Sequence, residues 1–222
     1  MGDYVKKYKR PGKLSWSDIF SAYGGIGRGG FFSAYRWKVF PHRVVSQFIP
    51  DKGIVYDIGS GYGIFSIYLA HEKAGRHVKG FDYSSLRLNS ARRAAKKLRL
   101  TNCVFFKEDV LKTKLAPCSA VVINDLLHHI PGWYLQKQLL EKVMKPILPG
   151  GRIVIVDVDK KPRWKYYLGL MVDLTFYPGS CIAYPDKNRL RKFLENNGFS
   201  VKILSLHQGR PYASIMYVAE SK

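Results

Sequence analysis

Short apolar runs alternate along the chain with segments whose apolar residues recur every three or four positions. The short runs are rich in β-branched residues, which is typical of buried strands. The longer segments gather apolar side chains on one face, as amphipathic helices do. The expected strands are 53–58, 77–82, 103–109, 120–125, 152–159, 199–206 and 214–220, and the expected helices after residue 50 are 63–73, 84–100, 133–148 and 186–197.

The order of these elements predicts the fold class. Strands and helices alternate from residue 53, and the strands are apolar throughout, as in parallel sheets covered on both faces. The last two strands follow each other without a helix and predict an antiparallel pair. We therefore expect an α/β fold with a Rossmann-like, doubly wound, seven-stranded sheet that is mostly parallel and has an antiparallel C-terminal strand.

Two segments depart from this alternation. Residues 1–50 are basic, aromatic and rich in glycine, and predict an N-terminal helical cap with one or two helices near 31–48. A domain at 51–222 follows. Residues 160–185 form an apolar insertion between a strand and the next helix, which places the insertion at the ligand-binding edge of the sheet.

Charge and cysteine content narrow the possible partners and compartment. Lys and Arg number 37 against 16 Asp and Glu, so the net charge is +21, which predicts attraction to nucleic acid or to an anionic membrane. Three scattered cysteines without a CxxC pair support neither a zinc site nor a disulfide framework. With no secretory signal and no bilayer-length apolar run, we expect a cytoplasmic protein, peripheral on the inner face of the membrane.

The stretch VYDIGSGYGIF forms a glycine-rich turn between a strand and a helix. Glycines at 59, 61 and 63 let the backbone turn tightly and approach a ligand closely. A dinucleotide site of the GxGxxG type needs glycine at position 64, where Ile64 stands, and the GK[ST] of a P-loop is missing. The turn is therefore a poor match to a phosphate-binding loop.

Polar side chains follow the first four strands, at the edge where such sheets bind ligands. An acid beside the glycine turn would repel a phosphate but attract a cationic group. An acid after the second strand is placed to accept hydrogen bonds from ribose hydroxyls. Strand-end acids also form turns and helix caps, an alternative that weighs most for Asp109. These side chains are Asp57, Asp82, Asp109, Asn124 and Asp125.

The ordered motifs VYDIGSGYG, GFDYS, FKEDV, VINDLLHHIP and LPGGRIVIVDVD, within 53–220, resemble class I S-adenosylmethionine-dependent methyltransferases of the small-molecule or lipid-type branch. The resemblance implies S-adenosyl-L-methionine as cofactor and S-adenosyl-L-homocysteine (SAH) as product. It places the glycines against the methionine and ribose, with Asp57 near the amino group or ordering the loop. The implied cofactor-binding residues are Asp57, Gly59, Ser60, Gly61, Gly63, Asp82, Tyr83, Asp109, Val110, Asn124 and Leu126.

Two histidines in DLLHHIP, His128 and His129, are the catalytic candidates. Paired histidines recur at this place in the quinone and phospholipid-headgroup methyltransferases that the chain resembles. A base helps methyl transfer when the acceptor carries a proton of high pKa, and His129 is the preferred candidate. The alternative is a histidine packed beneath the loop. No metal ligand set is expected.

The kind of acceptor is predicted from residues 1–50 and 160–185, the two segments that interrupt the alternation of strands and helices. The insertion combines a basic start with aromatic and aliphatic residues, which suits an interfacial helix or a lid packed on the core. The candidate substrate residues are Tyr23, Tyr35, Trp164 and Tyr167. We expect methyl transfer to a hydrophobic small molecule or lipid-like acceptor at a membrane surface.

The alternative function is an RNA methyltransferase that uses the basic surface. A third hypothesis is a protein that binds the cofactor but has no catalytic activity. The sequence lacks the [DNS]PP[YFW] motif of base-amino methyltransferases, which makes a nucleic acid partner less favoured. It predicts no oligomeric state.

Overall fold

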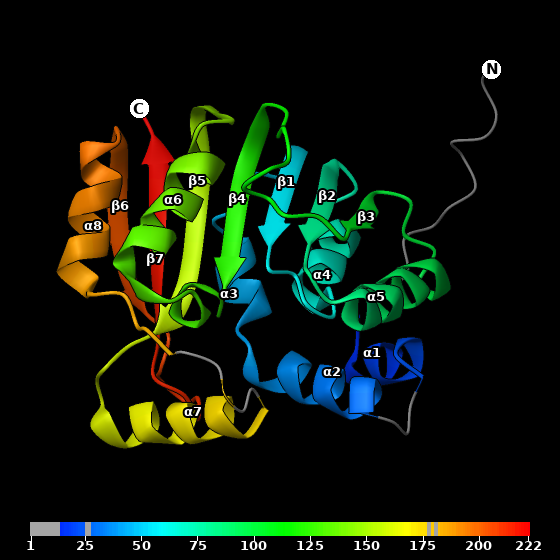
Figure 1. Ribbon diagram of the computed structural model, residues 1–222. Coiled ribbons are helices and arrows are strands. Elements are labelled where there is room, and N and C mark those ends of the chain that lie inside the picture. Colours follow the sequence, from blue (N-terminus) through cyan, green and yellow to red (C-terminus); the bar gives the residue numbers. More distant parts are fainter. Residues whose placement is uncertain (1–13, 25–27, 177–178, 180–181) are drawn as a thin grey trace.

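The computed structural model describes residues 14–24, 28–176, 179 and 182–222 (Figure 1). The first 13 residues of the basic N-terminal segment and one of the three cysteines, Cys181, lie outside the described residues.

A single mixed sheet forms the centre of the molecule. Its seven strands lie in the order β3-β2-β1-β4-β5-β7-β6. The pairs β1–β2, β1–β4, β2–β3 and β4–β5 are parallel, whereas β7 is antiparallel to both of its neighbours. The predicted Rossmann-like, doubly wound α/β fold is confirmed. The strands are β1 Gly53–Ile58, β2 Arg76–Phe81, β3 Cys103–Phe106, β4 Cys118–Asn124, β5 Ile147–Val158, β6 Phe199–Ser205 and β7 Ser214–Ser221.

Helices cover both faces of this sheet because the strands are apolar on both sides. Successive strand residues point to opposite faces, so Val122 packs with α4 and α5 while Val121 packs with α6 and α8. The sheet and its helices therefore form two separate hydrophobic cores, one on each face of the sheet. The helices are α1 Trp16–Ala22, α2 Arg28–Val39, α3 His42–Ser46, α4 Ile64–Glu72, α5 Ser85–Lys97, α6 Gly132–Met144, α7 Arg163–Phe176 and α8 Lys187–Asn196, with a 3₁₀ turn, η1, at Leu127–His129.

Helices α1, α2 and α7 lie across the end of the sheet at which the parallel strands terminate (Figure 1). Helix α7 is the predicted insertion, and α1 and α2 come from the N-terminal segment. Segments far apart in the sequence therefore cover one edge of the sheet together. Among the described residues, no helix combines the length and the apolar character needed to cross a membrane.

Several element boundaries differ from the sequence prediction, and three of the differences have a clear structural cause or consequence. Helix α1 was not expected; it begins at a capping box in which the Ser15 hydroxyl accepts from the Asp18 amide and the Asp18 carboxylate accepts from the Ser15 amide. The helix expected to reach residue 148 ends at Met144, because Ile147 already pairs with Cys118 in the sheet. Strand β3 ends at residue 106, so Asp109 lies in the following loop.

Candidate cofactor and acceptor site

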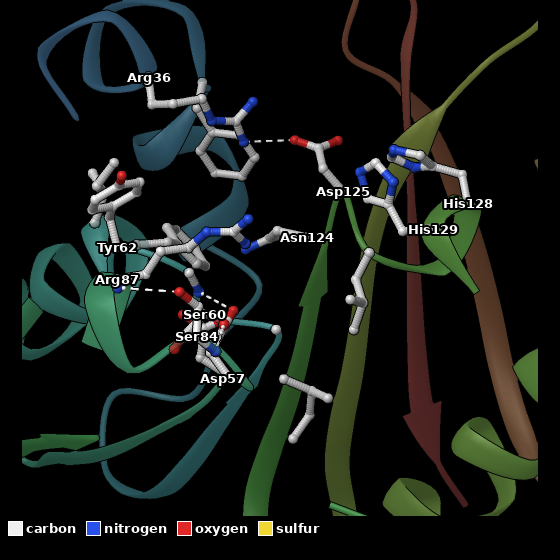
Figure 2. Close-up of a pocket in the computed structure, with 18 of the residues that line it drawn as sticks. Arg36, Asp57, Ser60, Tyr62, Ser84, Arg87, Asn124, Asp125, His128 and His129 are labelled. Atoms are coloured by element: carbon white, nitrogen blue, oxygen red, sulfur yellow. Dashed lines mark hydrogen bonds and ion pairs between the residues drawn. The ribbon is translucent and has the colours of Figure 1, made fainter. Parts of the chain in front are cut away.

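A cavity of about 610 Å³ lies at the carboxyl ends of the parallel strands, beneath α2 and α7. Its volume falls within the roughly 300–1,000 Å³ usual for small-molecule sites. The predicted residues come from separate elements, and most converge on this cavity (Figure 2). Those that line it are Tyr35, Asp57, Gly59, Ser60, Gly61, Asp82, Tyr83, Val110, Asn124, Leu126, His128 and His129.

The glycine turn serves two purposes. Gly59 has a φ of +74°, and a Cβ there would lie 2.8 Å from the Leu126 side chain, so glycine lets the β1 and β4 ends approach each other. Gly63 has a φ of +69° and faces the core, where a Cβ would collide with the Phe105 ring. Gly63 is not in the cavity lining and is required for packing and for the turn into α4.

Asp57 is a buried acid whose charge no cation balances in the described structure. Its carboxylate lines the cavity and accepts a hydrogen bond from Ser66 Oγ at 2.5 Å. Burial raises the pKa of Asp57 to about 6, with the hydrogen bond from Ser66 opposing the shift and the charge of Asp82 adding to it. This position therefore favours a positively charged ligand group.

Asp82 holds the glycine turn in place. Its Oδ2 accepts from the Gly61 amide at 2.9 Å, and its Oδ1 accepts from the Ser84 amide at 2.8 Å, beside the start of α5. One carboxylate therefore fixes the turn after β1 relative to the end of β2. The carboxylate is half-buried and lines the cavity, where its remaining lone pairs can accept from a ligand.

Two polar side chains in the lining have no hydrogen-bond partner among the described residues. The side-chain nitrogen and oxygen of Asn124 and the hydroxyl of Ser60 are fully buried. Because buried polar groups are almost always paired, these atoms are available for hydrogen bonds to a ligand in the cavity. Both lie on the floor of the cavity, at the ends of β4 and β1 (Figure 2).

The two histidines differ in their surroundings. His128 is buried, and its Nδ1 lies 2.6 Å from Asp157 Oδ1. Burial alone would lower the pKa of His128, but the charge and hydrogen bond of Asp157 raise it to about 9. Burial and the neighbouring His128 lower the pKa of His129 to about 4. The partner Asp157 was not predicted; an acid inside the apolar run RIVIVDVD is the sequence signal for such a pairing.

An ion pair links the N-terminal cap to the sheet. Arg36 of α2 donates to Asp125 Oδ2 at 2.6 Å, across the mouth of the cavity (Figure 2). Asp125 has a φ of +48°, a left-handed conformation that is uncommon for a residue other than glycine. The cap and the end of β4 are thereby fixed together next to the candidate site.

Four further candidates lie outside the cavity lining. The Tyr23 hydroxyl donates to the Tyr62 carbonyl at 2.6 Å, so Tyr23 supports the glycine turn from behind. Asp109 accepts from the Leu111 amide at 3.0 Å and forms a local turn, the alternative considered for this residue. Trp164 and Tyr167 point to solvent, with exposed fractions of 64% and 61%. The structure therefore does not bring these four side chains to the cavity.

Comparison with known protein families identifies one matching domain. The family described as a methyltransferase domain matches residues 50–198, about two-thirds of the chain. An S-adenosyl-L-methionine-dependent Diels–Alderase of Talaromyces variabilis is 24% identical over 153 residues, which make up 64% of this chain and 52% of that protein. A carboxy-S-adenosyl-L-methionine synthase of Glaesserella parasuis is 30% identical over 117 residues, 51% of this chain and 48% of that protein. The chain thus spans about half the length of the curated relatives it matches.

Solved structures share the fold. A magnesium protoporphyrin IX methyltransferase from Synechocystis with bound SAH matches with a TM-score of 0.64 and 20% identity, over 93% of this chain and 94% of that one. An O-methyltransferase family protein from Burkholderia thailandensis matches with a TM-score of 0.70 and 17% identity, over 87% of this chain and 59% of that one.

Proposed function

The chain belongs to the class I methyltransferase family, and from that premise we propose that it transfers a methyl group from S-adenosylmethionine to a hydrophobic small-molecule or lipid-like acceptor at a membrane surface. The observation that carries the proposal is the composition of the cavity. Its floor holds the buried acid Asp57, whose charge no described cation balances, and the helices above it, α2 and α7, have exposed apolar side chains on their outer faces.

The floor of the cavity suits the cofactor. S-adenosylmethionine carries a cationic amino group, a ribose and an adenine, and has no phosphate. We assign the amino group to the side of Asp57 and the ribose hydroxyls to Asp82, next to the glycine turn. The unpartnered amide of Asn124 is available to the methionine part. The first assignment balances the charge of Asp57, and the last gives Asn124 a partner that the described residues do not supply.

The acceptor side of the cavity lies between the histidine pair and α7. Methyl transfer from a sulfonium is an in-line displacement that depends mainly on proximity and alignment. His129 lines this side and is the candidate to take a proton from an acceptor hydroxyl or amine. Residues Gly169 and Val172 of α7 supply an apolar wall for the rest of the acceptor.

His129→Gln is expected to lower the rate of methyl transfer by about 100-fold, the lower end of the usual effect of a general base. The affinity for S-adenosylmethionine should stay within about twofold, because a base acts on the acceptor. The rate is measured as label that moves from methyl-labelled cofactor into a lipid extract. His77→Gln, an exposed histidine on β2, is the matched control. An unchanged rate in His129→Gln would remove this residue from the mechanism.

The outer face of α7 is unusually apolar for an exposed helix. Its exposed large apolar side chains recur with a spacing of three and four residues, so they share one face, while Gly169, Val172 and Asp173 face the cavity. Such an exposed apolar face, flanked by basic residues, favours an anionic lipid surface. The apolar residues on this face are Trp164, Tyr167, Met171 and Leu174, and the exposed basic residues before it are Lys160, Lys161 and Arg163.

Helices α1 and α2 extend the same surface. Trp16 and Phe31 are exposed, and their helices lie at the same end of the molecule as α7, with α2 between α7 and α1 (Figure 1). A protein resting on lipid through this surface would place its cavity next to the bilayer, so an apolar acceptor could enter without crossing water.

The double variant Trp164→Ser, Leu174→Ser is expected to lower binding to anionic vesicles by about 100-fold or more, since fully burying one large apolar side chain contributes about 1.5–3 kcal/mol. Flotation of the protein with vesicles of anionic phospholipid measures the binding, which should also weaken at high salt. Tyr134→Ser removes an equally exposed aromatic residue from α6 and should leave flotation unchanged. Wild-type protein that fails to float would contradict the membrane part of the proposal.

A further inference from the structure

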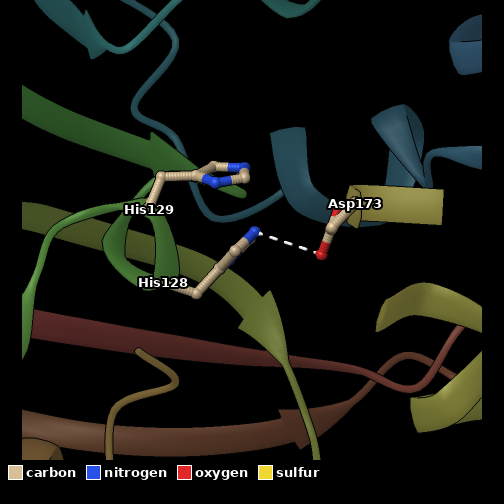
Figure 3. Close-up of side chains that lie close together, drawn as sticks. All are labelled: His128, His129 and Asp173. Atoms are coloured by element: carbon tan, nitrogen blue, oxygen red, sulfur yellow. Dashed lines mark ion pairs between the residues drawn. The ribbon is translucent and has the colours of Figure 1, made fainter. Parts of the chain in front are cut away.

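We propose that His128, His129 and Asp173 bind one first-row divalent cation with zinc-like ligand preference, on the acceptor side of the cavity. The proposal does not rest on methyl transfer, because it follows from the positions of these three side chains (Figure 3).

The three side chains bring two imidazoles and a carboxylate together from distant parts of the chain. Their ligand atoms all lie within 4.8 Å of one another, and His128 Nε2 is 3.5 Å from Asp173 Oδ2. Tetrahedral zinc with bonds of about 2.0–2.1 Å separates its ligands by about 3.3 Å. The His128–Asp173 pair is therefore already spaced as two ligands of one cation, and a shift of up to about 1.5 Å brings the third ligand atom to the same spacing.

His128 has the environment of a metal-bound histidine. Metal-ligating histidines usually present their second nitrogen to a carboxylate or carbonyl, and His128 Nδ1 lies 2.6 Å from Asp157 Oδ1. The other nitrogen, Nε2, is fully buried, makes no hydrogen bond among the described residues and points at Asp173 (Figure 3). Asp173 also has a supporting contact, because the Tyr184 hydroxyl lies 3.3 Å from its Oδ2.

The surrounding charges favour a cation. The carboxylates of Asp125, Asp157 and Asp173 all act on His128. Arg36 balances Asp125, which leaves two acids beside the histidine pair. Two nitrogen ligands and one oxygen ligand suit zinc, cobalt, nickel or iron, whereas magnesium and calcium prefer all-oxygen sites.

A bound cation would have two consequences. It would link η1, which carries both histidines, to α7, and so hold α7 in place over the cavity. Three protein ligands leave a position open, as in catalytic zinc sites. Coordination uses a lone pair on each imidazole, so His128 releases the proton on its Nε2 to solvent when the cation binds. It also occupies the lone pair of His129, so metal binding and the base role of this residue exclude each other.

The test is a titration of the untagged, full-length protein with Co²⁺ after removal of metals by a chelator, without cofactor or acceptor. We expect one Co²⁺ per chain, with the strong visible absorption of a four- or five-coordinate site, and its displacement by Zn²⁺. Asp173→Asn and His129→Ala should each weaken binding at least 10-fold, and Tyr184→Phe should weaken it a few-fold.

His77→Ala is the matched control and should bind Co²⁺ like the wild type, since His77 is exposed and lies outside the cluster. Urea unfolding of each variant separates lost ligands from lost structure, and Asp173→Asn changes only a partly exposed residue of the roof helix. No stoichiometric binding to the wild type, or wild-type affinity in both Asp173→Asn and His129→Ala, would overturn the proposal. Either result leaves methyl transfer untouched, because the readout involves no cofactor.

Discussion

Asp57→Asn is expected to weaken binding of S-adenosylmethionine by about 200-fold or more, because removing one partner of a buried charge pair costs about 3–5 kcal/mol. In the wild type the affinity should itself depend on pH. The raised pKa of Asp57, about 6, means that the empty site is protonated below pH 6 and must lose that proton to receive the cationic amino group. Between pH 5 and pH 7 the affinity should therefore rise by about tenfold. Calorimetric titrations of wild type and Asp57→Asn across this range measure both effects.

A truncated ligand provides the control for this prediction. Methylthioadenosine keeps the adenine and the ribose but has no amino group, so its affinity should be the same for wild type and Asp57→Asn. An equal loss for both ligands would mean that Asp57 orders the loop through Ser66 instead of contacting the amino group.

The same substitution is expected to stabilise the empty protein at neutral and alkaline pH. The folded pKa of Asp57, about 6, lies above its ordinary value of 3.8, so this group favours folding most below pH 3.8 and least above pH 6. The rise in the pKa of Asp57 from 3.8 to about 6 corresponds to an upper limit of about 3 kcal/mol in the free energy of unfolding. Urea unfolding should show a gain in the free energy of unfolding for Asp57→Asn at pH 8 that vanishes toward pH 4. Loss of stability at pH 8 would contradict the assignment of an unbalanced charge.

Asp82→Ala is expected to weaken both S-adenosylmethionine and methylthioadenosine by about 100-fold or more. Hydrogen bonds to a charged group contribute about 1.5–3 kcal/mol each, and the ribose would lose its acceptors. The glycine turn would also lose its support, because the Gly61 and Ser84 amides both donate to this carboxylate. The chain should still fold, since Asp82 is only half-buried and lies at the edge of the sheet.

Calorimetry with both ligands, together with circular dichroism, separates this variant from Asp57→Asn. Asp57→Asn should discriminate between the two ligands, whereas Asp82→Ala should not. A folded Asp82→Ala protein with unchanged affinity for either ligand would remove Asp82 from the ribose site.

The sequence predicted the sheet well because each strand is a short apolar run with a clear end. It also placed Asp57, Asp82 and Asn124 at one edge, since the carboxyl ends of parallel strands meet there. Helix boundaries were less predictable. The short α1 depends on its Ser15–Asp18 capping box, and the end of α6 depends on the pairing of Ile147 with β4.

The acceptor side of the cavity could not be predicted in the same way. The pairing of His128 with Asp157 and Asp173 joins η1, β5 and α7, and the spacing of these residues in the sequence does not predict such a tertiary arrangement. The insertion predicted an apolar helix, but not which face it turns to the cavity. Trp164 and Tyr167 proved to point to solvent, and Asp173 to the cavity.

The most direct measurement follows the methyl group itself. The protein is incubated with methyl-labelled S-adenosylmethionine and, in parallel, with vesicles of total lipid extract, with total RNA, or with neither. We expect label in the lipid fraction only, a rate that falls in Asp82→Ala, and formation of SAH in equal amount. Label in RNA alone, or cofactor that binds but gives no labelled product with any fraction, would contradict methyl transfer to a lipid-like acceptor.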